Sequence, residues 1–249
     1  MEEENKENEN QDKLDYEILF EDFSYFDLSF KLIVIGNSGK KLLLYNNQLK
    51  YISIIGVGKS CLSSQATRHK FEPTHLATIG FEYFTFNIKL KETIIKLQIW
   101  DTCGQEFYKS LISSFYRNTS LAIIVYSIDN QKSFDDLDMW LKDLKANSSP
   151  DVKIFLIGNK VDLEEERIIS KEMAEKFKND YDLDFFMETS AKTGFNTQEL
   201  FVKAAKVLFE DYNEYKKNKK NKLEDDEENQ DHTVQLVEKD MNKDNSRCC

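Results

Sequence analysis

The sequence has 249 residues, a formal net charge of −11 and 40% hydrophobic residues, which allows one large domain with appendages and a packed core. The acidic balance argues against a protein that binds nucleic acid through bulk charge, because a phosphate backbone requires a basic surface. No apolar run reaches the roughly 18 residues of a membrane span, and the four cysteines suggest neither a zinc site nor a disulfide framework.

The negative charge is concentrated at the two ends of the chain. Residues 1–27 carry a net charge of −9 and residues 211–249 carry −3, whereas residues 28–210 are nearly neutral at +1. We expect residues 1–27 to be a disordered acidic extension and residues 213–249 to be a flexible tail, because charged segments with few apolar residues cannot bury a core. The predicted domain is therefore residues 28–212.

Continuous apolar runs alternate with segments of helical periodicity inside this domain. The predicted strands are residues 30–35, 81–90, 93–100, 120–127, 152–158 and 184–187. The predicted helices are residues 133–145, with Ser133 as the expected N-cap, 170–179 and 197–215. Apolar strands that alternate with helices indicate an α/β fold with a largely parallel sheet covered on both faces. Ligands of such sheets bind at the carboxyl ends of the strands.

The first phosphate-binding element is divided by an insertion. One half follows the first strand and the other opens a helical segment after 17 further residues; the halves are Gly36, Asn37, Ser38, Gly39 and Val57, Gly58, Lys59, Ser60. Joined, they fit the P-loop pattern G-x-x-x-x-G-K-[ST]. In that loop backbone N–H groups surround a phosphate, the lysine reaches the β- and γ-phosphates, and the hydroxyl binds Mg²⁺.

Polar residues with matching chemistry follow two later strands. Asp101 can hold Mg²⁺ through water, Gly104 can offer its N–H to a γ-phosphate, and Gln105 can orient an attacking water. The alternative for Asp101, Gly104 and Gln105 is an ordinary strand-to-turn segment.

The Asp162 carboxylate can accept two hydrogen bonds from N1–H and the amine of guanine, whereas adenine offers no such pair. Residues 188–192 supply further loop N–H groups at the same edge.

In their order along the chain, these motifs resemble those of the small GTPases of the Ras superfamily, most closely the Rab family, over about residues 29–210. The matching segments are the split GNSG…VGKS, ATIGFEYF (77–84), WDTCGQE (100–106), GNKVD (158–162) and ETSAK (188–192), with Rab character in IGFEY (79–83), LISSFYR (111–117) and the terminal Cys248-Cys249. The resemblance implies a P-loop NTPase fold, that is, a six-stranded mostly parallel sheet flanked by about five helices, which binds GTP or GDP with Mg²⁺.

The resemblance also assigns roles to single residues. The metal ligands are Ser60, Thr78 and, through water, Asp101, and the phosphate site extends to Cys61. The guanine site consists of Phe71, Asn159, Lys160, Asp162, Ser190, Ala191 and Lys192. Lys160 would pack its stem on the base, and the Ala191 N–H would bind the guanine oxygen. The effector surface consists of Tyr83, Trp100 and Phe115, for which core packing is the alternative.

The function implied by the resemblance is that of a slow GTPase that acts as a switch in vesicle and membrane trafficking. Its partners would be effectors, an exchange factor, a GTPase-activating protein and the prenylation machinery, without nucleic acid, and the chain would be a monomer. Cys248 and Cys249 would carry two geranylgeranyl chains, since two lipids give stable anchoring. The location would be the cytoplasmic face of an intracellular membrane, with cycling to the cytosol. An ATP-dependent P-loop kinase is disfavoured by Asn159-Lys160-Val161-Asp162.

The insert, residues 40–56, leaves two interpretations open. Closing such a loop costs only about 2.5 kcal/mol, but the loop must leave and re-enter the phosphate nest at one peptide, and it carries apolar residues. We hypothesise that it is a translated intron, because Gly39-Lys40-Lys41 can encode a 5′ splice signal and Ile55-Gly56 the closing AG. The alternative is a real insertion that weakens nucleotide binding and leaves an interaction scaffold.

Overall fold

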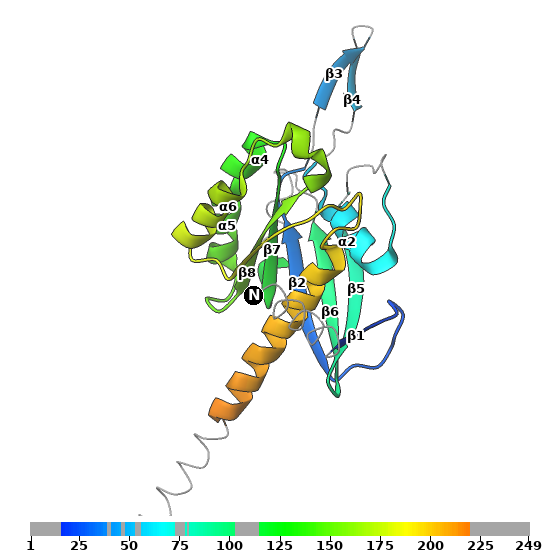
Figure 1. Cartoon of the computed structure of the whole chain (residues 1–249), viewed down its shortest axis with the longest axis vertical. Coiled ribbons are helices and arrows are strands. Elements are labelled where there is room, and N and C mark those ends of the chain that lie inside the picture. The colour runs from blue at the N-terminus through cyan, green and yellow to red at the C-terminus, as the bar shows by residue number, and fades with distance from the viewer. Residues whose placement is uncertain are drawn as a thin grey trace, which may run out of the picture. The chain divides into compact units, whose positions relative to one another are not determined.

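Seven strands form one mixed sheet and two further strands pair in a separate hairpin within the residues that the structure, a computed structural model, describes (Figure 1). These residues are 16–38, 41–45, 48–52, 56–72, 78, 80–102 and 115–219, with the backbone alone for 41–45 and 48–52. The strands are β1 (Tyr16–Leu19), β2 (Leu28–Ile35), β3 (Lys41–Tyr45), β4 (Gln48–Ile52), β5 (Phe81–Leu90), β6 (Thr93–Thr102), β7 (Leu121–Ser127), β8 (Lys153–Asn159) and β9 (Phe185–Glu188). The helices are α2 (Lys59–Arg68), α4 (Gln131–Asp135), α5 (Leu137–Asn147), the 3₁₀ helix η2 (Val161–Glu166), α6 (Lys171–Asp180) and a last helix over 197–219.

The order of the strands in the large sheet is β1-β5-β6-β2-β7-β8-β9. The ladders that join β6, β2, β7, β8 and β9 are parallel, whereas β5 runs antiparallel to β6 and β1 antiparallel to β5. The predicted α/β fold with a largely parallel sheet is therefore confirmed, as are the six predicted strands, within a few residues at their ends.

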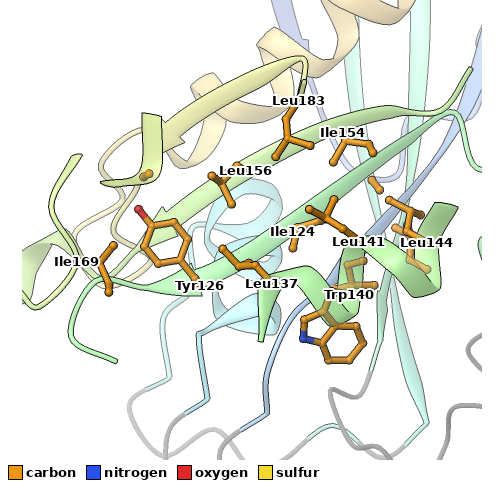
Figure 2. Close-up of a cluster of buried hydrophobic side chains, with 14 of the residues drawn as sticks. Ile124, Tyr126, Leu137, Trp140, Leu141, Leu144, Ile154, Leu156, Ile169 and Leu183 are labelled. Atoms are coloured by element: carbon orange, nitrogen blue, oxygen red, sulfur yellow. The ribbon is translucent and has the colours of Figure 1, made fainter. Parts of the chain in front are cut away.

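Helices cover both faces of this sheet, which explains why its central strands carry long apolar runs. All seven residues of β7 are buried. Helices α4, α5 and α6 lie on one side and α2 on the other (Figure 1). On the first side Trp140 and Leu144 of α5 belong to one buried hydrophobic cluster with Ile124 of β7 and Leu156 of β8 (Figure 2). Leu32 and Val34, at alternate positions of β2, are buried on the opposite face.

The sheet has one strand more than the sequence predicted. Residues 1–27 were expected to be disordered, but this is wrong for β1, which pairs with the end of β5 in the register Tyr16↔Leu90 to Leu19↔Asn87. The chain after β1 is also held, because the Asn87 side chain donates to the carbonyl oxygens of Phe20 and Glu21. A few apolar residues in an acidic segment form a strand here because the edge of β5 offers unpaired backbone groups.

The predicted helix 133–145 is two helices, and its predicted N-cap is wrong. Asn130 caps α4, and its side chain accepts a hydrogen bond from the backbone N–H of Ser133 at 3.1 Å. The Ser133 hydroxyl is buried and donates to the Asn130 carbonyl oxygen. The chain then bends at Asp136, which ends α4 and begins α5. The N-cap of α6 is Ser170, as the start of the predicted helix 170–179 suggests.

The insert contains a hairpin. Strands β3 and β4 pair antiparallel with each other, from Lys41↔Ile52 to Tyr45↔Gln48, and form a sheet separate from the large one. The intron hypothesis stays a prediction, because a hairpin can form in either case.

The chain divides into two compact units, residues 1–206 and 207–249. The structure describes residues 207–219 of the second unit, and these are helical, so the predicted flexible tail is wrong for residues 213–219, where the last helix continues. Among the helices that it describes, none combines the length and the apolar character needed to cross a membrane.

Candidate functional site

The carboxyl ends of four parallel strands carry the motif residues of the predicted site. Gly36 follows β2, Asp101 lies near the end of β6, Asn159 ends β8 and Glu188 ends β9. Since β6, β2, β7, β8 and β9 are joined by parallel ladders, these ends lie at the same edge of the sheet. This is the edge at which a ligand of an α/β sheet is expected.

Two glycines shape the loop between β2 and α2. Gly36 has a φ of 138° and Gly58 a φ of 90°, both in the region that favours glycine. A Cβ at Gly36 would lie 2.2 Å from the carbonyl oxygen of Val125, and a Cβ at Gly58 would lie 2.5 Å from Nδ2 of Asn159. Both positions therefore require glycine, for the close backbone approach that a phosphate-binding loop needs.

The two halves of the split motif lie against each other. The backbone N–H of Val57 donates to the Asn37 carbonyl oxygen at 3.3 Å, and Lys59 Nζ donates to the Gly36 carbonyl oxygen at 2.8 Å. Lys59 is only 6% exposed, so its ammonium group is held within the loop. The insert therefore does not keep the two halves apart, which answers the geometric objection raised by the sequence.

Three oxygen-bearing side chains meet beside this loop. The Ser60 hydroxyl donates to Asp101 Oδ2, and Thr78 Oγ1 lies 2.7 Å from Ser60 Oγ. Because the single hydrogen of Ser60 is used by Asp101, Thr78 must be the donor in the second bond. Two hydroxyls and one carboxylate are hard oxygen ligands of the kind that Mg²⁺ prefers.

The burial of Asp101 supports this assignment. The carboxyl group is fully buried, and its Oδ1 has no hydrogen-bond partner among the described residues. Burial raises the pKa of Asp101 to about 7, against the opposing effects of Lys59 and of the hydrogen bond from Ser60. A buried carboxylate with one unused oxygen fits a cation site, and Ser60, Thr78 and Asp101 would hold Mg²⁺ there.

The other residues predicted for the phosphate site are only partly described. Ser38, in the first half of the loop, and Cys61, in α2, are half-buried, and burial raises the pKa of the Cys61 thiol. The remaining predictions of phosphate-binding, catalytic and lipidated residues lie outside the described residues; they are Gly39, Gly104, Gln105, Cys248 and Cys249.

Asn159 joins three loops at the sheet edge. Its Nδ2 donates to the Val57 carbonyl oxygen at 2.8 Å. Its Oδ1 accepts from the Thr189 hydroxyl at 3.1 Å and from the Ala191 N–H at 3.2 Å. The Ala191 N–H, which the resemblance assigns to the guanine oxygen, is thus bonded to Asn159. The side chain ties the phosphate loop to both segments predicted to bind the base.

The predicted base selector, Asp162, is held from two sides. Its Oδ1 accepts from the Ser190 hydroxyl at 2.6 Å, and its Oδ2 lies 3.5 Å from Lys192 Nζ. Lys160 has a positive φ of 69° and its Nζ lies 3.7 Å from Asp129 Oδ2. The predicted base-contacting residues Lys160, Asp162, Ser190, Ala191 and Lys192 are therefore together, whereas Phe71 is half-buried just after α2.

The predicted effector residues form part of an aromatic cluster. Trp100 lies 5.5 Å from the ring centroids of both Tyr83 and Phe115. Phe81 joins them at 5.1 Å from Trp100 and 5.0 Å from Phe115. Phe81 is 46% exposed and Tyr83 is 41% exposed, so half of the cluster faces solvent.

Sequence reasoning missed four residues that take part in these arrangements. Phe81 could have been found from its spacing, since residues 81 and 83 share one face of a strand. Asp129 follows a strand end at the same edge and could have been considered for that reason. Asp136 and Trp140 bind Asn37 from about 100 residues away, and no local signal indicates this contact.

A comparison with protein-family models matches residues 51–210 to the Ras family. The match covers 160 of the 249 residues. It begins inside the insert and therefore leaves out the first half of the split loop, residues 36–39.

Proposed function

This chain belongs to the Ras family and has the domain of a small GTPase, and we propose that it is a Rab-like switch in intracellular vesicle and membrane trafficking. The observation that carries the proposal is the joining of the split loop with the oxygen cluster of Ser60, Thr78 and Asp101. A scaffold that does not bind nucleotide has no need for this arrangement, so it is not the function we favour.

The chain's own residues suggest how a guanine nucleotide would be held. Lys59 and the backbone around Gly58 would bind the phosphates, because the start of a helix and a buried ammonium group both attract anions. Asp162 would accept hydrogen bonds from the base, since its carboxylate has only acceptors. When bound, Mg²⁺ would neutralise charge on the phosphates.

Hydrolysis is proposed to be the in-line attack of a water on the γ-phosphate. Gln105 would orient the water, and Lys59 would stabilise the negative charge that develops on the phosphoryl oxygens. An arginine supplied by a GTPase-activating protein would accelerate the step. The intrinsic rate is expected to be low, because this arginine is proposed to come from the partner.

Release of the γ-phosphate is proposed to change two segments, residues 70–80 and 102–113. Thr78 belongs to the first, and its contact with Ser60 links that segment to the metal site. Loss of this contact would free the segment, and effectors would read the change at the aromatic cluster of Phe81, Tyr83, Trp100 and Phe115. Exchange factors and GTPase-activating proteins are the further partners that such a cycle needs.

The proposed location is the cytoplasmic face of an intracellular membrane, in exchange with the cytosol. Cys248 and Cys249 would be prenylated, because two chains give an anchor where one gives only marginal binding. The tail beyond the last helix, residues 220–249, would act as a tether between the domain and the membrane.

The proposal is tested by guanine-nucleotide binding to two chains, the full sequence and a variant that lacks residues 40–56. We expect both to bind GDP and GTP in the presence of Mg²⁺, because the two halves of the loop already meet across the insert. Isothermal titration calorimetry gives the affinities, with ATP as the control nucleotide.

The pattern of binding separates the remaining interpretations. If only the shortened chain binds, the intron hypothesis is favoured. Transcript sequencing would support it further if the transcripts uniformly lack the segment. Binding by neither chain, or equal binding of ATP, contradicts the proposed function.

The variant Gln105→Leu is expected to slow GTP hydrolysis at least tenfold and to leave the affinity for GTP unchanged, because leucine cannot orient water. Phosphate release in a single turnover measures the rate, and Gln131→Leu on the exposed surface of α4 is the control. An unchanged rate removes Gln105 from the proposed mechanism.

A further inference from the structure

Asn37, in the first half of the split loop, uses both ends of its side-chain amide. Nδ2 donates to Asp136 Oδ2 at 2.7 Å, and Oδ1 accepts from the indole Nε1 of Trp140 at 2.8 Å. Both are short, well-formed hydrogen bonds. An amide that is satisfied on both sides by two different partners is fixed in position and orientation.

The two partners are themselves immobilised. Asp136 stands at the junction of α4 and α5 and also pairs with Lys132 at 2.8 Å. Burial alone would raise its pKa, but the hydrogen bonds from Lys132 and Asn37 hold the pKa of Asp136 below its ordinary value. The acceptor is therefore an ionised carboxylate at neutral pH, which strengthens the bond from Asn37.

Trp140 is anchored by packing. It is only 3% exposed and belongs to the hydrophobic cluster between α5 and the sheet (Figure 2). A ring fixed in this way presents its N–H in one direction, and a buried indole N–H needs a partner. Asn37 is that partner.

The second half of the loop has a different anchor, since Asn159 Nδ2 binds the Val57 carbonyl oxygen at 2.8 Å. Between the halves the structure gives the hydrogen bonds Val57 N–H to Asn37 and Lys59 to Gly36. In an uninterrupted loop, successive peptide bonds would fix this register. Here 17 residues intervene, and the register depends on how firmly each half is held to the domain.

We propose that Asn37 is a positioning residue for the nucleotide site, which holds the first half of the split loop against Lys59 through Asp136 and Trp140. We call these three residues the amide clamp. It replaces the chain continuity that the insert removes, and so determines how tightly the insert-containing chain holds its nucleotide. This inference rests on the proposed function.

The alternative is that the clamp only stabilises the fold. A pair of substitutions shows whether the contact between Asn37 and Asp136 is responsible, and the melting temperature of each variant separates the two roles. Asn37→Asp places a carboxylate against that of Asp136 and removes the donor between them, while the acceptor for Trp140 is kept. Adding Asp136→Asn restores one donor and one acceptor at that contact with the direction of the bond reversed.

The test measures the dissociation rate of fluorescently labelled GDP from the full chain. Asn37→Asp is expected to accelerate dissociation about ten- to a hundredfold, and the pair Asn37→Asp with Asp136→Asn is expected to return it to within about threefold of the unmodified chain. Trp140→Phe, which keeps most of the packing, is expected to accelerate it several-fold. Asn179→Asp, on an exposed position of α6, is the matched control.

The same substitutions are then made in the chain that lacks residues 40–56. If the clamp replaces chain continuity, Asn37→Asp has a smaller effect there, because the peptide bonds of the joined loop hold the register. Circular dichroism melting of every variant without nucleotide checks the fold.

Three results overturn the inference. If GDP dissociates from Asn37→Asp at the rate of the unmodified chain, the Asn37 amide does not position the first half of the loop. Failure of Asp136→Asn to restore slow dissociation shows that the contact between the two side chains is not the cause. Equal acceleration with and without residues 40–56 shows that the clamp does not compensate for the insert. Absence of GDP binding by both unmodified chains instead contradicts the proposed function, and this inference with it.

Discussion

Replacing Lys59 with alanine is expected to lower the affinity for GDP and GTP at least about a hundredfold. Hydrogen bonds to charged groups contribute about 1.5–3 kcal/mol each, and a lysine that binds two phosphate oxygens makes two of them. The substitution also removes the positive charge that opposes the effect of burial on Asp101. The buried carboxyl group would then be protonated over a wider pH range, which weakens Mg²⁺ binding as well.

Calorimetric titration with GDP, with and without Mg²⁺, measures both effects of Lys59→Ala. The matched control is Lys176→Ala, because Lys176 is exposed on α6 and is not one of the predicted site residues. Lys176→Ala is expected to bind GDP like the unmodified chain. If Lys59→Ala binds GDP within tenfold of that control, Lys59 is not a phosphate ligand and the split loop is not a nucleotide site.

The parts of the fold that could be predicted are those whose sequence carries the signal by itself. β7 is apolar from Leu121 to Tyr126 and β2 is apolar over residues 32–35 because both faces of the sheet are covered, and a continuous apolar run records this directly. The strand β1 could not be predicted in the same way. Its four residues lie in an acidic segment, and they form a strand because the edge of β5 is free to pair with them.

The bend at Asp136 shows a second limit of sequence reasoning. The apolar spacing of residues 137–144 correctly predicts the face of α5 that packs on the sheet. The spacing does not reveal that α4 is a separate helix capped by Asn130. The choice between Asn130 and Ser133 as the cap depends on the burial of the Ser133 hydroxyl, which is a property of the tertiary structure.

Motifs at strand ends indicated several residues that the structure brings together. Ser60 and Asp101 are brought together as the motif chemistry requires, because parallel strands end at one edge. Thr78 was assigned through the family resemblance, since nothing local marks it as a partner of Ser60. The partners of Asn37 are about 100 residues distant, and Trp140 looks like any apolar residue of an amphipathic helix.

Replacing Asp162 with asparagine is expected to lower the affinity for GDP by about a hundredfold or more and to raise the affinity for xanthosine diphosphate. A carboxylate offers acceptors to N1–H and the amine of guanine, whereas an amide offers one acceptor and one donor. The NH₂ group of the asparagine would face the guanine amine. Two donors would then meet without an acceptor, and a buried donor left unpaired weakens binding strongly. Xanthine carries a carbonyl where guanine carries its amine, and this carbonyl accepts a hydrogen bond from the asparagine amide. Calorimetric titration with both nucleotides measures the change in preference.

The substitution Asp162→Asn is also expected to preserve the local contacts of residue 162. Asp162 Oδ1 accepts from the Ser190 hydroxyl at 2.6 Å, and the amide oxygen of asparagine can accept the same bond. The facing Lys192 Nζ is 3.5 Å from Oδ2 and 59% exposed, so it can turn to solvent. Asp151→Asn, on an exposed turn, is the control and is expected to keep guanine preference. A loss of GDP binding by Asp162→Asn without a gain for xanthosine diphosphate means that Asp162 supports the loop and does not read the base. Unchanged GDP binding means that the selectivity lies elsewhere in the segment from Asn159 to Asp162.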